Sequence, residues 1–185
     1  MAKSDQERIN AAEKFAAEKH KGQTRIGGDP YISHPMAVAQ IIKEQGYGTD
    51  YQIAALFHDL LEDTDASEDE IRQLGGSEVL EAVRLLTKQP GYIMSEYVEG
   101  ILSNPIARAV KAADRLHNLR SALVADEDFR RKYILETVDW YLDFSPEIPK
   151  AVQSLVKSLD TPLTELPFLY EPIDTWKISS QNINP

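Results

Sequence analysis

The chain has 185 residues, a net charge of −10 and no cysteine. This length indicates one domain, and the 42% apolar and 27% charged fractions are ordinary for a globular protein. The missing cysteines exclude disulfides and Cys-ligated metals, and the acidic balance disfavours broad binding to nucleic acid or to anionic membranes. The sequence shows neither a transmembrane stretch nor a secretory signal, so we expect a cytoplasmic protein.

Apolar residues recur at intervals of three and four, and strict alternation is scarce, which predicts an all-α fold. The expected helices span residues 4–19, 34–44, 49–62, 67–74, 77–87, 95–102, 105–124, 126–144 and 145–160. Ser4 with Glu7, and Ser67 with Glu70, fit capping boxes at two helix starts. We assign residues 1–160 to one helical domain and residues 161–185 to an irregular tail rich in proline and aromatic residues.

The segment expected to form the 49–62 helix is the most apolar of the chain, yet it holds His58 and Asp59 side by side. Glu62 follows His58 by four residues, and Asp63 follows Asp59 by four, so each pair stacks on one helix face. Burying three unpaired carboxylates would cost several kcal/mol, and a divalent cation such as Mn, Fe or Zn would remove that cost. The alternative is a core histidine beside a solvated helix end.

Two distant segments supply further candidate ligands. His34 precedes Pro35, which favours an extended backbone and lets the imidazole project from a loop. Asp114 lies on an apolar helix face and needs a partner, either a metal or a salt bridge to Arg115 or to a neighbouring helix. With the His-Asp pair above, these residues form a set of two His and two Asp with positions left for water and substrate.

Three segments carry a resemblance to a known family: HKGQTRIGGDPYISHP (20–35), AALFHDLLEDT (54–64) and VKAADRLHNLRS (110–121). In order and spacing they resemble the HD superfamily of metal-dependent phosphohydrolases. Within it, they look like the (p)ppGpp hydrolase domain of the RelA/SpoT homologues and the small alarmone hydrolases. The resemblance covers roughly residues 5–160 and implies an HD-domain helical bundle, with residues 1–160 as the phosphohydrolase domain.

The resemblance also implies a role for individual residues. The implied ligands of one Mn(II) ion are His34, His58, Asp59 and Asp114. The residues implied to position and activate the attacking water are Glu62 and Asp63. The residues implied to contact the nucleotide are Arg25, Tyr31, Asn118 and Ser121. The alternative for Arg25 and Tyr31 is a solvated loop. The implied reaction removes pyrophosphate from the 3′ position of ppGpp or pppGpp and leaves GDP or GTP.

Two departures from the family pattern leave the substrate open. Ile26 stands where the family commonly has a second basic residue, and the segment TKQPGYIMSEYVEGILSNP (87–105) is shorter than in the long bifunctional enzymes. Ser121 matches a position where the family more often has Thr. One alternative is an HD phosphohydrolase that acts on another phosphorylated nucleotide or cofactor. Another is a catalytically silent domain that senses a nucleotide, although the retained Glu62 and Asp63 argue against it. His20 and His117 have no assigned role, and we expect both to be surface or packing residues.

Overall fold

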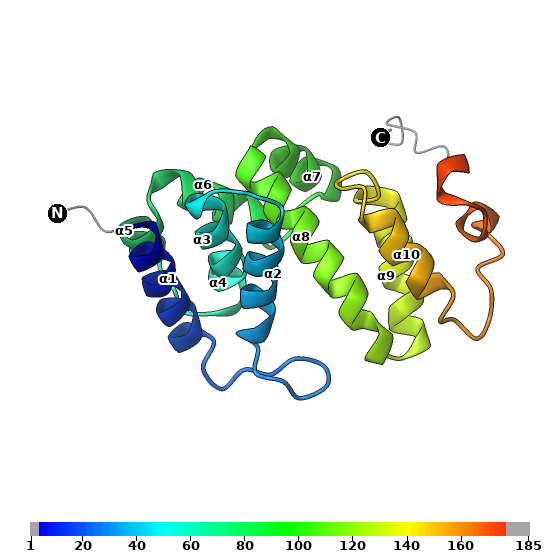
Figure 1. The fold of residues 1–185 in the computed structure, drawn as a ribbon, viewed down its shortest axis with the longest axis horizontal. Helices are drawn as coiled ribbons and strands as arrows, with labels where there is room; N and C mark the ends of the chain where they lie inside the picture. The colour runs from blue at the N-terminus through cyan, green and yellow to red at the C-terminus, as the bar shows by residue number, and fades with distance from the viewer. Residues whose placement is uncertain (1–3, 177–185) are drawn as a thin grey trace. The chain divides into compact units, whose positions relative to one another are not determined.

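The computed structural model describes residues 4–176 and shows a chain of helices (Figure 1). Within these residues there is no β-strand, and one isolated bridge joins Thr24 to Pro30. The all-α fold predicted from the sequence is therefore confirmed. The chain forms two compact units, residues 1–114 and 115–185. The boundary between domain and tail after residue 160 stays a prediction, and residues 177–185 of that tail lie outside the described part.

The first unit contains eight helical segments. They are α1 (Asp5–Lys19), α2 (Ser33–Glu44), α3 (Thr49–Phe57), α4 (Leu60–Asp63), α5 (Glu68–Gly75), α6 (Ser77–Leu86), α7 (Met94–Ser103) and α8 (Pro105–Ser121), which continues into the second unit. The predicted capping boxes form at Ser4 and Ser67. At the α5–α6 corner, Gly76 has φ +95°, and a Cβ on Gly75 would lie 2.7 Å from Val79, so this corner favours glycine at both positions.

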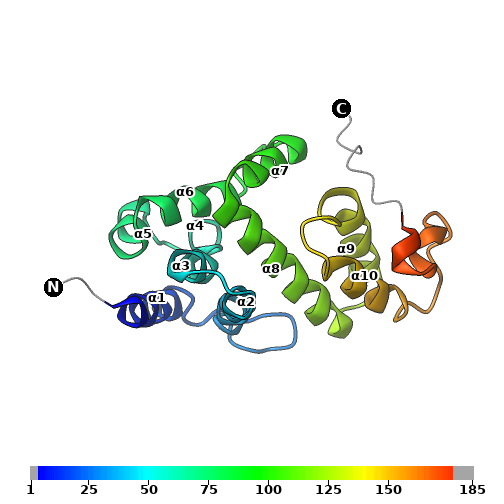
Figure 2. The same cartoon turned by 45° about the horizontal axis from the view of Figure 1, so that its top comes forward.

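The helix α3 forms the centre of the first unit. It packs against α1, α2, α5 and α6, and Figures 1 and 2 show it beside α1 and α2. Its residues from Ile53 to Phe57 are fully buried, because the sequence there is apolar around the whole helix. A polar residue placed directly after this segment is therefore held inside the unit.

The structure corrects the expectation of one continuous helix over residues 49–62. The helix α3 ends at Phe57, a turn covers His58 and Asp59, and α4 begins at Leu60. Asp59 has φ −101° and ψ −2°, which departs from helical geometry by a small rotation only. The chain direction continues because the Asp63 N–H donates to the Asp59 carbonyl at 2.9 Å. The break between α3 and α4 therefore changes the local backbone at His58 and Asp59, while Glu62 and Asp63 still follow one turn later.

The second correction concerns the start of α2. His34 does not lie in an extended loop, because α2 begins at Ser33 and the His34 N–H donates to the Tyr31 carbonyl at 2.9 Å. Pro35 is tolerated here because N–H groups in the first turn of a helix have no partner within that helix. The imidazole is consequently fixed by a helix and not by a loop.

The second unit packs α9 (Glu127–Trp140) against α10 (Ile148–Val156). The end of α8 leads through the 3₁₀ turn η1 (Ala122–Val124) into α9, whose N-cap Asp126 accepts from the Phe129 N–H at 2.8 Å. The described part of the tail contains two more 3₁₀ turns, η2 (Pro167–Tyr170) and η3 (Ile173–Thr175). Its attachment to α9 includes Glu127, which accepts the backbone N–H of Thr161 at 3.3 Å.

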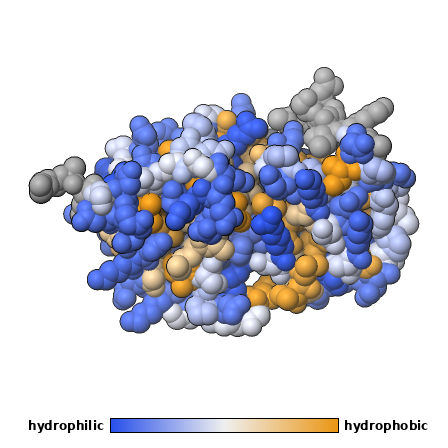
Figure 3. All heavy atoms as spheres, in the orientation of Figure 1, coloured by the Kyte–Doolittle hydropathy of each residue, from blue (hydrophilic) through white to orange (hydrophobic). Residues whose placement is uncertain are grey.

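The face shown in Figure 3 is mainly hydrophilic. Single apolar residues remain exposed, including Ile26 at 65% and Val124 at 74%. Among residues 4–176, no helix is both long and apolar enough to cross a membrane.

Candidate metal centre

Four side chains of the first unit converge on one point, and we call them the ligand cluster: His34, His58, Asp59 and Asp114. The two Nε2 atoms of the histidines lie 3.2 Å apart. Asp114 Oδ1 lies 3.2 Å from His34 Nε2, and Asp59 Oδ2 lies 3.2 Å from His58 Nε2. The ligand atoms of His34, His58 and Asp59 all lie within 4.8 Å of one another, which suits a single metal ion. The structure thus brings together all four predicted ligands.

The ligand cluster is largely removed from solvent. His34, His58 and Asp114 are 2%, 4% and 5% exposed, while the side chain of Asp59 is 22% exposed. Three of the four groups therefore lie in the interior, and Asp59 forms the side that water and substrate can reach. A ligand set with one open side is the arrangement of a catalytic metal site and not of a closed structural one.

The electrostatics of the cluster favour a positive charge at its centre. Burial lowers the pKa of His34, whereas at His58 the carboxylates of Asp59 and Asp114 outweigh burial and raise the pKa. Burial would raise the pKa of both carboxyls, but His58 holds the pKa of Asp59 low and Lys111 holds that of Asp114 low. Two ionised carboxylates in an interior pocket attract a proton or a cation.

His58 presents the correct ring nitrogen to the centre. Its Nδ1 lies 2.7 Å from the carbonyl oxygen of Ala55, which can only accept, so Nδ1 carries the hydrogen. When His58 is neutral, as a metal ligand must be, Nε2 keeps its lone pair and points at the other ligands. Imidazole and carboxylate donors of this kind suit Mn, Fe and Zn, so the donor set fits a divalent transition metal.

The partner of Asp114 is a lysine on its own helix. Lys111 Nζ lies 3.0 Å from Asp114 Oδ2, while the other carboxylate oxygen faces the histidines. Arg115, the partner considered from the sequence, pairs with Glu136 at 2.8 Å in the second unit. Residues three apart share a helix face and adjacent residues do not, which explains the choice of partner. Lys111 compensates part of the negative charge of Asp114 and leaves Oδ1 of that carboxylate available to a metal ion.

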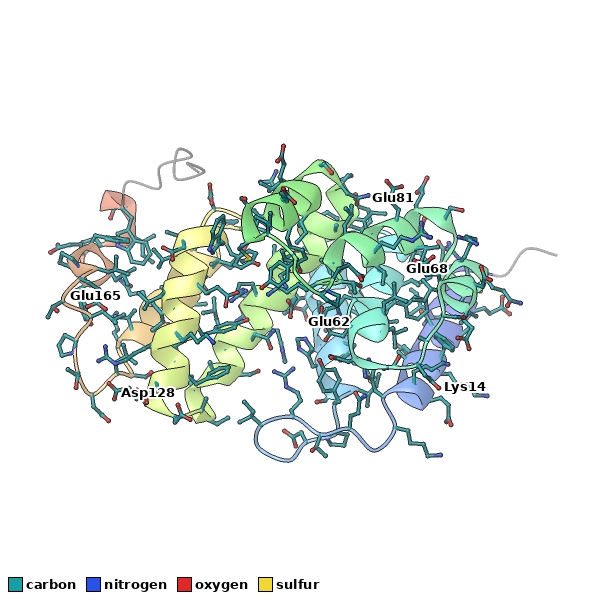
Figure 4. The ribbon with its side chains drawn as sticks, turned by 180° about the vertical axis from the view of Figure 1, so that it is seen from behind. Lys14, Glu62, Glu68, Glu81, Asp128 and Glu165 are labelled. Carbon is teal, nitrogen blue, oxygen red and sulfur yellow. The ribbon has the colours of Figure 1, made fainter. Side chains whose placement is uncertain are left out.

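The acidic pair Glu62 and Asp63 lies at the end of α4, where Figure 4 labels Glu62. Both residues are exposed. Glu62 Oε2 accepts the backbone N–H of Lys88 at 3.1 Å, and Asp63 Oδ2 accepts from the Tyr31 hydroxyl at 3.0 Å. Each carboxylate is therefore oriented by one hydrogen bond and still reaches solvent, as a group that takes a proton from water must.

Tyr31 connects the acidic pair to the ligand cluster. Its hydroxyl also donates to Asp59 Oδ2 at 2.7 Å. Burial, together with the charges of Asp59 and Asp63, raises the pKa of this phenol far above its usual value, so it remains a donor. Tyr31, which the family resemblance implies as a nucleotide contact, thus contacts the candidate metal ligand Asp59.

The other predicted nucleotide contacts come from two further segments of the chain. Arg25 lies half-buried in the α1–α2 loop, where its N–H donates to the Asp29 carbonyl at 2.9 Å. Asn118 and Ser121 lie on the last turns of α8, in the second unit. A role for these three residues in binding a nucleotide stays a prediction.

Sequence reasoning missed two residues next to Tyr31. His20 is 2% exposed, and its ring stacks on that of Tyr31 with the centroids 4.7 Å apart. Gln23 accepts from His20 Nδ1 at 2.8 Å and donates to the Asp63 carbonyl at 2.7 Å. His20 is therefore a packing residue, as expected, but it packs on the site. Both residues lie in the HKGQTR segment, which is the one signal that pointed to them.

Comparison with known proteins identifies the class of the site. Residues 12–90 match the model of the HD domain family. This range includes three members of the ligand cluster and both members of the acidic pair. The recognition of an HD domain from the sequence is confirmed, and with it the HD-domain helical bundle.

The relatives make the likeness more specific. The chain is 35% identical over 180 residues to the Brucella melitensis GTP pyrophosphokinase rsh, covering 91% of this chain and 23% of that protein. It is 40% identical over 144 residues to the guanosine-3′,5′-bis(diphosphate) 3′-pyrophosphohydrolase of Aquifex aeolicus, covering 73% of this chain and 20% of that protein. The chain thus spans about a quarter or less of the length of these curated relatives.

A solved structure covers nearly the same length. It is described as a metazoan ortholog of SpoT that hydrolyzes ppGpp and plays a role in starvation responses. The TM-score is 0.68 at 25% identity, and the match covers 85% of this chain and 97% of that one. The chain therefore resembles the HD domains of the SpoT-like proteins in both sequence and fold.

Proposed function

We propose that this chain hydrolyses the 3′-pyrophosphate of (p)ppGpp and releases pyrophosphate together with GDP or GTP. The observation that carries the proposal is the convergence of the ligand cluster with Tyr31 and the acidic pair. Two relatives support the choice of substrate, since one is named as a 3′-pyrophosphohydrolase and the solved structure is described as hydrolysing ppGpp.

In this reaction a water oxygen bonds to the phosphorus next to O3′, the P–O3′ bond breaks, and O3′ takes a proton. We assign Glu62 and Asp63 to orient the water and accept its proton, because both carboxylates reach solvent. The hydrogen bonds from Lys88 and Tyr31 hold these two carboxylates in place. A positioned carboxylate of this kind contributes roughly 10²–10⁴-fold to the rate.

The cation proposed for the site is one Mn(II) ion, held by His34, His58, Asp59 and Asp114. When bound, such an ion supplies a Lewis acid for the phosphoryl oxygens and lowers the pKa of a bound water. Lys111 fixes Asp114 through Oδ2 and leaves Oδ1 toward the histidines. The residues around the ion thus set its position before any substrate arrives.

The nucleotide itself would contact Arg25, Asn118 and Ser121, together with Tyr31. Arg25 can meet a phosphate as a two-pronged donor or stack on a base. Ile26 is 65% exposed and offers no charge, so this loop provides one cation fewer than the family pattern. Ile26 is the observation that favours a second candidate function, the hydrolysis of another phosphorylated nucleotide or cofactor. The cytoplasmic location expected from the sequence stays a prediction.

The decisive experiment is to incubate the purified chain with ppGpp, with Mn(II) in one sample and with a chelator in the other. Pyrophosphate and GDP that appear only with Mn(II) would support the proposal. No turnover of ppGpp by protein that retains Mn(II) would contradict it. Turnover of another phosphorylated nucleotide in a panel would then favour the second candidate, and metal binding without any turnover would favour a nucleotide sensor.

A further inference from the structure

The hydroxyl of Tyr31 lies between two carboxylates with different proposed tasks. It lies 2.7 Å from Oδ2 of Asp59, the same atom that faces His58, and 3.0 Å from Oδ2 of Asp63. Ionised carboxylates only accept hydrogen bonds, and a phenol has a single proton. The two carboxylates therefore share the proton of the Tyr31 hydroxyl. Two negative groups that would otherwise repel each other are thereby held at a common donor.

The ring of Tyr31 is itself held in place by neighbours. His20 stacks on it with the rings inclined by 28°, and the ring of His34 meets it edge-on with the centroids 6.1 Å apart. The backbone is tied as well, because the Tyr31 N–H donates to the Gln23 carbonyl at 2.9 Å. One stacking face of this ring is therefore occupied by protein.

His20 joins this ring to the backbone of Asp63. The amide oxygen of Gln23 only accepts, so His20 Nδ1 carries the hydrogen of their 2.8 Å contact. The amide nitrogen of Gln23 then donates to the Asp63 carbonyl at 2.7 Å. The other ring nitrogen, His20 Nε2, is buried without a hydrogen bond among the described residues. A buried nitrogen without a partner is costly, and a phenyl ring would stack without that cost, so the contact to Gln23 is the reason for an imidazole here.

We propose that Tyr31 is a positioning residue that fixes Asp63 beside the metal ligand Asp59, and that His20 and Gln23 hold Tyr31 and Asp63 in register. This role goes beyond the nucleoside contact that the family resemblance implies for Tyr31. Its kinetic consequences rest on the proposed function, whereas its effect on metal binding does not.

Replacing Tyr31 distinguishes a positioning role from a substrate contact. Tyr31→Phe keeps the ring and removes the shared donor, so Mn(II) binding should weaken by about 10-fold and kcat for ppGpp should fall by about 10- to 100-fold. The KM should change by less than about threefold, because the ring and the loop remain. The matched control is Tyr47→Phe, since Tyr47 also stacks on a neighbour, Tyr51, at 4.7 Å and lies outside the site.

Opposite results would overturn the proposal. A rise in KM with unchanged kcat and unchanged Mn(II) affinity would make Tyr31 a substrate contact only. Mn(II) affinity is measured by electron paramagnetic resonance on the free protein and needs no substrate. If the unaltered chain does not hydrolyse ppGpp, the proposed function fails, and the Mn(II) affinity of Tyr31→Phe still decides whether Tyr31 positions Asp59.

The second arm tests His20 through Gln23, which avoids cutting a cavity into the interior. Gln23→Ala removes the link to Asp63 and should lower kcat by about 10-fold, with KM and Mn(II) affinity within about threefold of the unaltered chain. His20→Phe keeps the stacking and removes the hydrogen bond that orients the Gln23 amide, so it should also lower kcat, by no more than Gln23→Ala does. A full-rate Gln23→Ala variant, or a His20→Phe variant with full activity, would exclude the role of this pair.

Discussion

The ligand cluster and the acidic pair are opposite in environment, although His58 and Asp59 come only four residues before Glu62 and Asp63. His34, His58 and Asp114 are almost fully buried, whereas Glu62 and Asp63 are exposed. The two carboxyls of the ligand cluster, Asp59 and Asp114, have pKa values lowered by His58 and Lys111, while each member of the acidic pair is held by a single hydrogen bond.

This difference separates binding from proton transfer. Burial makes an ionised carboxylate a strong attractor for a cation, because water no longer screens its charge. Exposure leaves a carboxylate able to exchange protons with solvent. A four-residue helix, α4, is enough to carry the chain from one environment to the other. Changes in the two groups should therefore affect different observables.

The largest effect should come from removing the charge of a candidate metal ligand. Asp59→Asn keeps the shape and loses a ligand charge, so we expect Mn(II) affinity to fall by more than about 100-fold and pyrophosphate release to be abolished. Metal content after dialysis and release of pyrophosphate measure the two effects. The control Asp69→Asn changes a carboxylate that is 91% exposed and should leave both intact. Full metal retention in Asp59→Asn would remove this residue from the ligand cluster.

Changing the acidic pair should lower kcat without lowering the affinity for Mn(II). Glu62→Gln should lower kcat by roughly 10²–10⁴-fold and leave Mn(II) affinity within about threefold, because the amide cannot accept the proton. Glu81→Gln, on the exposed side of α6 in Figure 4, is the matched control. Equal losses of metal in Glu62→Gln and Asp59→Asn would contradict the division of tasks.

Removing the partner of Asp114 should expose the cost of its burial. Lys111→Met leaves a buried carboxylate without its cation, so the metal-free protein should lose about 3 kcal/mol, or roughly 6–12 °C in Tm. Added Mn(II) should recover more stability in this variant than in the unaltered chain, since the metal then compensates the charge alone. Thermal unfolding with and without Mn(II) measures this, and Lys111→Arg is the charge-keeping control. An unchanged Tm without metal would show that Lys111 does not compensate Asp114.

The smallest effect concerns an exposed carboxylate that has no role in the site. The Ser67 N–H and hydroxyl and the Lys19 ammonium lower the pKa of Glu70 from 4.5 to about 2. A lowered pKa means that this cap stabilises the fold above pH 4.5 and loses its contribution as the pH falls toward 2. Glu70→Gln should therefore reduce Tm by roughly 2 °C at pH 7, with the difference shrinking below pH 4.5. Glu99→Gln, on α7, is the control, and a difference independent of pH would contradict the capping role.

Residue chemistry alone was sufficient to select the side chains that converge. His58, Asp59 and Asp114 stand out because each interrupts an apolar helix face, where an unpaired polar group is costly. The helical periodicity also predicted the all-α fold. Both the polar residues on apolar faces and the helical periodicity can be recognised from neighbouring residues in the sequence. Both therefore predict the structure without knowledge of tertiary contacts.

The features that the sequence did not predict depend on tertiary contacts. The apolar pattern continues through Leu60 and Leu61, so nothing local marks the turn at His58. The roles of Tyr31 and His20 follow from a stack between the end of α1 and the start of α2. The helix position of His34 overrode the backbone preference set by Pro35, because the first turn of a helix needs no N–H from proline.

The ligand cluster draws on three segments of the first unit that are far apart in the sequence, at the start of α2, the α3–α4 turn and α8. A cation held there binds only the folded unit, and at 100 times its Kd it would add about 2.7 kcal/mol to the stability of that unit. Proteases cleave the transiently opened form of a protein. The lifetime of the chain in a cell would therefore rise and fall with the supply of metal.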